Sequence, residues 1–228
     1  MQVASEMAAP DNNKEYGYCM GRKVDTGALE GYRYYLSLRT VLEMLNDRGY
    51  DIPSSQLSRS LAEFRSIFGD KPDIERLRFD FPLRSKPSKK MLVLFLGTDE
   101  VKTQTVRHIF GQILNRENIQ GLMLILQSKM TPIAKKEVKK FPFKVEIFQI
   151  TDLLVNITKH ILQPKHEILT AAEKHILLKK YMLEDEQLPR MLENDAIARY
   201  YGLEKGQLVK LTYSDGFADS LETYRCIQ

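Results

Sequence analysis

The sequence has few cysteines, no long apolar run and no secretory pattern. Only Cys19 and Cys226 occur among 228 residues, and they provide neither a disulfide framework nor a cysteine pair at zinc-binding spacing. No apolar run reaches the roughly 20 residues that a membrane-spanning helix needs. The N-terminus lacks the basic and then apolar pattern of a secretory signal. We therefore expect an intracellular protein in a reducing compartment, with no membrane contact.

The sequence also has little net charge. Lys and Arg total 34 and Asp and Glu total 30, which gives a formal net charge of +4. A charge this small does not make the whole surface attractive to nucleic acid, so any basic site must be local. Hydrophobic residues make up 43% of the chain, which is enough for the core of one large domain or two smaller ones.

The chain begins with a segment that has no sustained period. Residues 1–29 are mostly small or polar, and we expect them to form a flexible tail. Apolar residues at helical spacing then predict an amphipathic helix that ends near Gly49. A second helix is predicted after Pro53 and before Gly69. Its buried face would hold Leu57, Leu61, Phe64 and Ile67.

Beyond Pro72 the period changes to strands separated by helices. Alternating residues predict a half-exposed strand, and continuous apolar runs predict strands that are buried on both faces. We expect strands at residues 77–83, 91–97, 121–127 and 145–150, and helices at about 100–116, 132–140 and 151–160. This alternation predicts a small, mostly parallel α/β sheet with helices packed on it.

Residues 161–228 follow a different pattern, so we place a domain boundary at residue 160. Thr170 and Glu173 form a capping box that predicts the start of a helix. The buried stripe of this helix is expected to hold Ile176, Leu177 and Tyr181.

A short helix and two strands are predicted after it. Asp195 is expected to cap a helix of residues 196–201, which Gly202 ends. Lys205 and Gly206 then turn the chain into a strand. A turn at Ser214-Asp215-Gly216 would lead into the last strand, and the C-terminal domain is therefore predicted to be α+β.

Several blocks of the sequence resemble one family in order and spacing. They include LRTVLEMLNDRGY, NIQGLMLILQSKMTPIAKK, QLPRM and NDAIARYYGLEKGQLVKL. These blocks resemble the fifth-largest subunit of eukaryotic nuclear DNA-directed RNA polymerases, and the C-terminal ones also resemble its archaeal counterpart. The resemblance covers about residues 30–228. It implies a nuclear protein with an α/β jaw domain at residues 30–160 and an assembly domain at 161–228 that fastens to the largest subunit.

Two blocks resemble the plant variant of this subunit that serves RNA polymerase V. The subunit shared by polymerases I, II and III usually has Asp-Pro where this chain has Asp195-Ala196, and an Arg-x-Ser-Glu turn at residues 213–216. FKVEIFQITDLLVNITKH and DAIARYYGLEKGQ resemble the plant variant instead. This resemblance implies a role in RNA-directed DNA methylation and transcriptional silencing. The alternatives are the general subunit of polymerases I, II and III and a stand-alone transcription co-regulator.

One pattern is typical of a catalytic site. GTDE after one predicted strand and QSK after the next are similar to nuclease-like α/β folds, in which acidic residues hold a catalytic magnesium ion. Gln127 stands where the second acid is needed, and Asp99 alone cannot build such a site. His160, His166 and His175 show no paired metal-ligand spacing. We expect no catalytic residue, no metal and no cofactor, and a degenerate nuclease remains an alternative.

Residues 131–140 are the expected contact with nucleic acid. Thr131 can cap a helix, Pro132 suits its first position, and the free N–H groups of that turn favour an anion. A cationic stripe would follow at spacings of four residues, formed by Lys135, Lys136, Lys139 and Lys140. The alternative is a solvated helix face. The resemblance implies that the jaw flanks downstream double-stranded DNA and that its Thr-Pro loop points toward it, although Ile133 replaces the family's usual Ser.

Four residues are expected to dock the C-terminal domain on the largest subunit. They are Arg190, Arg199, Tyr200 and Tyr201. Arg and Tyr favour such a role because they bury much surface and still form hydrogen bonds. The alternative for the two tyrosines is ordinary core, and one of the two is expected there.

Overall fold

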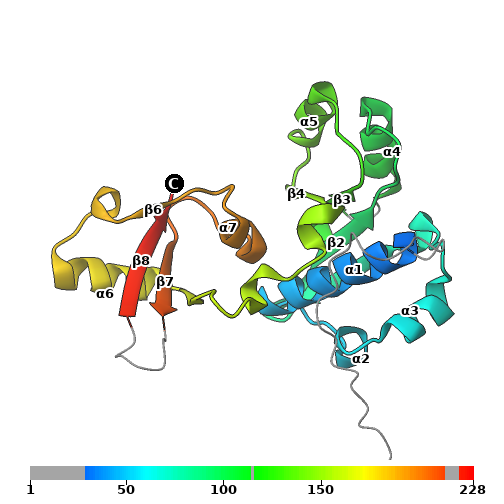
Figure 1. Cartoon of the computed structure of the whole chain (residues 1–228). Coiled ribbons are helices and arrows are strands. Elements are labelled where there is room, and N and C mark those ends of the chain that lie inside the picture. Colours follow the sequence, from blue (N-terminus) through cyan, green and yellow to red (C-terminus); the bar gives the residue numbers. More distant parts are fainter. Residues whose placement is uncertain (1–28, 114–115, 214–220) are drawn as a thin grey trace, which may run out of the picture.

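The computed structural model describes residues 29–113, 116–213 and 221–228. The predicted tail lies outside these ranges except for Leu29, and the predicted turn at Ser214-Asp215-Gly216 lies outside them entirely. Figure 1 shows two separate sheets, an α/β part formed by the described residues of 29–149 and an α+β part formed by those of 165–228. Residues 150–164 connect the two sheets. The division of the chain at residue 160 stays a prediction.

The first sheet has four strands in chain order. They are β1 (Arg78–Leu83), β2 (Lys86–Phe95), β3 (Ile119–Leu126) and β4 (Lys144–Gln149). β1 pairs antiparallel with β2, and the other neighbours pair in parallel. The predicted mostly parallel sheet is therefore confirmed. β2 begins before the apolar run because its first residues complete a hairpin with β1.

Helices cover both faces of this sheet. The helices are α1 (Leu29–Asp47), α2 (Ser54–Leu57), α3 (Leu61–Phe68), α4 (Thr103–Gln112) and α5 (Pro132–Val138). Met91 and Val93 of β2 belong to the core with α1, whereas Leu92 and Leu94 belong to the core with α4 and α5. The apolar runs are thus buried on both faces, as expected, and each fully buried side chain contributes about 1.5–3 kcal/mol.

Two helices predicted before residue 161 are wrong, because the structure does not form either one as a single α-helix. The helix predicted from Pro53 to Gly69 is split at Ser60, whose side chain accepts a hydrogen bond from the Glu63 N–H at 3.2 Å in a capping box. A capping residue has non-helical backbone, so one helix cannot run through it. Ile67, expected on the buried face, is exposed.

The second of these errors concerns residues 151–160. The structure has the short 3-10 turns η4 (Ile150–Leu153) and η5 (Ile157–Lys159) instead of an α-helix. The side chain of Asn156 accepts a hydrogen bond from the Thr158 N–H at 3.0 Å, and this local bond replaces a helical one.

The second sheet has the strand order β5-β7-β8-β6. Its strands are β5 (Lys165–Ile168), β6 (Arg190–Met191), β7 (Leu208–Tyr213) and β8 (Leu221–Ile227), with helices α6 (Ala171–Tyr181) and α7 (Ala196–Tyr201). The remaining 3-10 turns are η2 (Ile74–Arg76), η3 (Arg116–Asn118) and η6 (Asp185–Gln187). The capping box of Thr170 with Glu173 is confirmed, and so are the cap by Asp195 and the left-handed Gly202 that ends α7.

The predicted buried stripe of α6 is confirmed at Leu177 and wrong at Ile176 and Tyr181. Ile176 is 66% exposed and Tyr181 is 54% exposed, while Leu177 and Leu178 pack on the small core formed by Leu208 and its neighbours. The core of the second sheet therefore packs on the side of α6 that carries Leu177 and Leu178, and the side that carries Ile176 and Tyr181 is exposed. Within the described ranges, no helix is long and apolar enough to cross a membrane.

Two glycines in helices provide a test of this packing. A Cβ atom at Gly31 in α1 would lie 2.5 Å from the Asp70 carbonyl oxygen, whereas a Cβ at Gly111 in α4 would meet no atom within 4 Å. We expect Gly31→Ala to lower the free energy of unfolding by about 1–3 kcal/mol, because the backbone must shift. Gly111→Ala should raise it by about 0.5–1 kcal/mol. Urea denaturation of both variants measures this, and equal effects would contradict the packing at Gly31.

Candidate functional site

The predicted nucleic-acid contact lies on α5 and the residues that follow it. The Thr131 hydroxyl accepts a hydrogen bond from the Ala134 N–H at 3.2 Å, and Pro132 is the first helical residue, so the predicted cap is confirmed. The exposed residues on this surface are Pro132, Ile133, Lys135, Lys136, Lys139 and Lys140.

One carboxylate reduces the positive charge of this surface. Glu137 accepts hydrogen bonds from Lys140 at 2.7 Å and from Arg107 of α4 at 3.1 Å, and these bonds, Lys140 first, lower the pKa of Glu137. Among the described residues, the other three lysines of the stripe form no ion pair. Three of the four lysines in the stripe therefore carry a positive charge that no carboxylate neutralises among the described residues.

The predicted docking residues divide into two groups. Arg190 is exposed at the edge strand β6. Arg199, Tyr200 and Tyr201 instead lie on α7, which faces the first sheet (Figure 1). The Arg199 guanidinium donates to the Ile147 carbonyl oxygen at 2.6 Å and stacks on the Phe148 ring at 4.3 Å. This contact covers part of the open edge of strand β4.

Arg48 connects α1, β4 and α7 at this junction. Its Nη1 and Nη2 atoms donate to the two carboxylate oxygens of Glu146 at 3.0 and 2.8 Å. Its Nε donates to the Tyr200 carbonyl at 2.8 Å, and Nη2 also donates to the Arg199 carbonyl at 2.6 Å. The side chain of Arg48 is 6% exposed and that of Glu146 is 14% exposed. Arg48 therefore acts as a C-terminal cap for α7 from a distant part of the chain.

Tyr200 is part of the same junction. Its side chain is 2% exposed, its hydroxyl donates to Asp47 at 2.7 Å, and Asn156 donates to that hydroxyl at 3.1 Å. Burial first, and then the hydrogen bond to Asp47, raises the pKa of Tyr200 well above its ordinary value, so the phenol stays a donor. Tyr200 is therefore a core residue, as the alternative holds, and its hydroxyl is hydrogen-bonded to residues of the same chain.

A second carboxylate of α1 extends this network toward η5. Asn156 also donates to Glu43 at 2.7 Å, and Lys159 donates to the same carboxylate at 2.6 Å. Glu43 and Asp47 lie four residues apart, on one face of α1. The connecting residues are thus fixed to α1 on the same side as α7.

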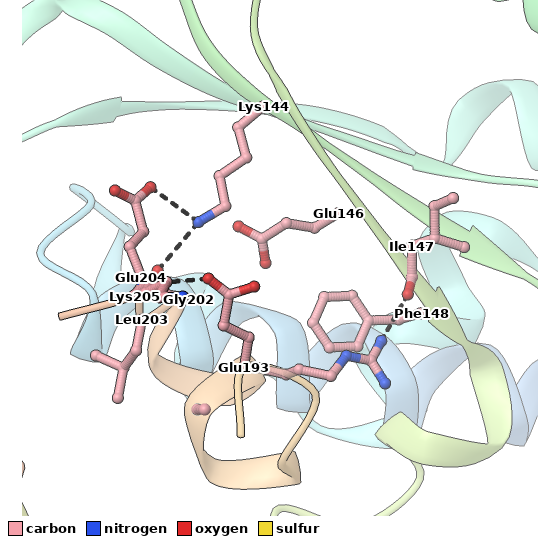
Figure 2. Close-up of a pocket in the computed structure, with 11 residues that line it drawn as sticks. Lys144, Glu146, Ile147, Phe148, Glu193, Gly202, Leu203, Glu204 and Lys205 are labelled. Carbon is pink, nitrogen blue, oxygen red and sulfur yellow. Dashed lines mark hydrogen bonds and ion pairs between the residues drawn. The ribbon is translucent and has the colours of Figure 1, made fainter. Parts of the chain in front are cut away.

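A cleft of about 520 Å³ opens beside this junction, between β4 and α7. Figure 2 shows Lys144 reaching from β4 to the Gly202 carbonyl at 3.2 Å and to the Glu204 carboxylate at 3.1 Å. On the other side, Glu193 accepts a hydrogen bond from the Lys205 N–H at 3.2 Å. The lining holds three cationic and three anionic side chains. The charges offset one another, so the cleft does not favour a charged ligand of either sign.

The residues of the nuclease-like pattern form local contacts. The Gln127 amide donates to the Tyr34 hydroxyl, and the Ser128 hydroxyl donates to the Asp99 carbonyl oxygen. Within the described ranges, no three His, Cys, Asp or Glu side chains lie close enough together to hold a metal ion.

Sequence reasoning missed the residues that join the two sheets. Arg48 and Glu146 are 98 positions apart, and Arg48 and Tyr200 are 152 positions apart. Arg48 lies at the end of a predicted helix, where a basic residue is ordinary. No spacing in the sequence signals contacts between residues so far apart.

The sequence matches two family models along most of its length. Residues 28–113 match the family described as RNA polymerase Rpb5, N-terminal domain, and residues 155–227 match RNA polymerase Rpb5, C-terminal domain. The two matches occur in the order in which the two sheets follow each other along the chain.

Curated relatives match over nearly the whole chain. DNA-directed RNA polymerase V subunit 5C of Arabidopsis thaliana is 52% identical over 92% of this chain and 90% of its own length. DNA-directed RNA polymerases IV and V subunit 5B of the same plant is 49% identical, over 91% of this chain and 95% of its own. The subunit RPABC1 of polymerases I, II and III from Caenorhabditis briggsae is 36% identical, over 87% of this chain and 97% of its own.

Replacing Arg48 tests the junction. We expect Arg48→Met to lower the free energy of unfolding by about 3–5 kcal/mol, because it leaves the Glu146 carboxylate and the Tyr200 carbonyl without partners. Urea denaturation measures the change. Lys144→Ala removes an exposed ion pair across the same junction and should cost no more than about 1 kcal/mol.

The double variant Arg48→Met/Glu146→Leu separates two explanations for this loss. It removes the unpaired carboxylate, so it should be more stable than Arg48→Met alone. A double variant that is no more stable than the single one would show that the loss comes from the α7 carbonyls or from packing, and not from Glu146.

Proposed function

The chain belongs to the RNA polymerase Rpb5 family, and on that premise we propose that it is the fifth subunit of plant RNA polymerase V. Membership in the family makes it a subunit of a DNA-directed RNA polymerase. The observation that supports polymerase V is the higher identity to relatives named for polymerases IV and V than to relatives named for I, II and III. The general subunit of those three enzymes is the second candidate.

The proposed role is mechanical and non-catalytic. The C-terminal domain would fasten to the largest subunit, and the jaw would hold downstream duplex DNA through phosphates, while the catalytic magnesium ion lies in other chains. In the nucleus, the enzyme would serve RNA-directed DNA methylation and silencing. Exposed Arg190 supports the docking role, and the capped α5 with its exposed lysines supports the DNA contact. Such contacts are independent of sequence.

Affinity purification tests the assignment to an enzyme. A tagged copy of the chain, expressed in Arabidopsis thaliana, should recover the largest subunit of polymerase V in a one-to-one ratio, as identified by mass spectrometry. Recovery of the largest subunit of polymerase II instead would support the general subunit. Elution of the native chain as a free monomer on size exclusion would favour a stand-alone co-regulator and contradict the proposal.

Replacing the four lysines of α5 and of the two residues after it tests the DNA contact. The variant with Ala at Lys135, Lys136, Lys139 and Lys140 should bind duplex DNA more weakly, and the slope of log affinity against log salt should fall by about 1 per lost phosphate contact. Fluorescence anisotropy over a salt series measures this slope. The control variant places Ala at the exposed Lys71, Lys179, Lys180 and Lys205 and removes the same charge. An unchanged slope in the α5 variant would exclude α5 as a contact.

A further inference from the structure

The hairpin between β1 and β2 is the most basic short segment outside α5. Residues 84–90 read RSKPSKK, with four basic residues and no acidic one. The pairing of β2 with β3 begins only at Lys90, so the earlier residues extend beyond the neighbouring strand. All side chains of the segment except Lys89 are exposed.

The backbone of this hairpin is tied to the end of α1. The Arg84 N–H donates to the Gly49 carbonyl at 3.0 Å, and the Asp51 N–H donates to the Pro82 carbonyl at 2.8 Å. Tyr50 and Leu83 form an antiparallel bridge between these two bonds. The base of the hairpin is therefore fixed to the core.

Most of the positive charge on the hairpin is not neutralised. Lys90 pairs with Asp80 at 2.6 Å. Arg84 is held by the side-chain amide oxygen of Asn46, and Lys89 is held by the backbone carbonyl of Glu117, each at 2.6 Å. These oxygens carry no net charge, so they orient the two cations without cancelling them. Within the described ranges, Lys86 forms no ion pair, and neither Asp51 nor Glu117 pairs with the hairpin.

We propose that this hairpin binds the phosphodiester backbone of a nucleic acid through Arg84, Lys86 and Lys89, as a second contact separate from α5. Cations that are oriented but not neutralised can each bind one phosphate in the continuous array of a nucleic-acid backbone. The exposed hydroxyls of Ser85 and Ser88 add donors of the kind that bind phosphates. Protein partners, in contrast, need buried aromatic or aliphatic anchors, and residues 84–90 contain none.

The inference needs the family membership but not the proposed contact at α5. Residues 84–90 lie before the apolar part of β2, and α5 lies after β3, so the two surfaces can be changed independently. The phosphates can belong to the DNA template or to the RNA product, because a polymerase holds both. The chemistry of recognition is the same in the two cases.

Salt-dependent binding of the purified full chain tests the proposal. The hairpin variant Arg84→Gln/Lys86→Gln/Lys89→Gln is compared with the unchanged chain on duplex DNA and on single-stranded RNA by fluorescence anisotropy. The slope of log affinity against log salt should fall by about 1 for each cation lost, or about 3 in all. Lys71→Gln/Lys179→Gln/Lys180→Gln removes the same charge elsewhere and should leave the slope unchanged. Thermal melting checks the fold, and Lys86→Gln alone, which breaks no ion pair, should lower the slope by about 1.

The salt slopes of the hairpin variant, the α5 variant and the control variant together show which surface binds phosphates. A fall on duplex DNA alone assigns the hairpin to the template, a fall on RNA alone assigns it to the transcript, and a fall on both supports a shared phosphate site. A normal slope in the hairpin variant with a reduced slope in the α5 variant overturns the inference and leaves the α5 contact standing. The reverse result supports the hairpin and excludes α5. A control variant that reproduces the fall shows a general charge effect and also overturns the inference.

Discussion

The buried guanidinium of Arg48 holds together three parts of the chain, the end of α1, β4 and α7, which lie far apart in the sequence. It forms four hydrogen bonds, two to the carboxylate of Glu146 in the first sheet and two to the last carbonyls of α7. A lysine has three donors on one nitrogen and could not satisfy four acceptors in this planar arrangement. A cation that is 6% exposed also requires a paired anion, so the orientation of α7 and the position of β4 depend on each other.

Charges are paired at the junction around Arg48 but largely unpaired on α5 and on the β1–β2 hairpin. At the junction, cations and anions are paired, as in the contacts of Lys144 with Glu204 and of Lys159 with Glu43. On α5 and on the β1–β2 hairpin, cations outnumber anions, and several have neutral partners or no ion pair among the described residues. A net charge of only +4 is therefore concentrated locally. This pattern separates surfaces that fix the shape of the chain from surfaces available to a polyanion.

Local signals in the sequence were enough to predict most elements. Thr170 with Glu173, and Asp195 with Gly202, fixed the ends of helices because capping acts over three to seven residues. Periodicity was less reliable where burial depends on distant segments. It placed Ile176 on a buried stripe, although the second sheet covers only one side of α6. Most of the junction was beyond prediction, because neither spacing nor composition links Arg48 to partners 98 and 152 positions away.

The junction also bears on the proposed phosphate contacts, which do not depend on base sequence. It would fix the surfaces that make these contacts at one position in the molecule. Phosphate contacts carry no information about base sequence, so they position nucleic acid only if the protein surface itself is positioned. A buried ion pair adds little net stability compared with an apolar contact, but it is costly to break and strict in its geometry. Arg48 with Glu146 meets these conditions between the first sheet and α7, and the hydrogen bond from Tyr200 to Asp47 adds a second contact between α7 and α1. A basic surface on the first sheet would thus keep a fixed orientation to whatever holds the C-terminal domain.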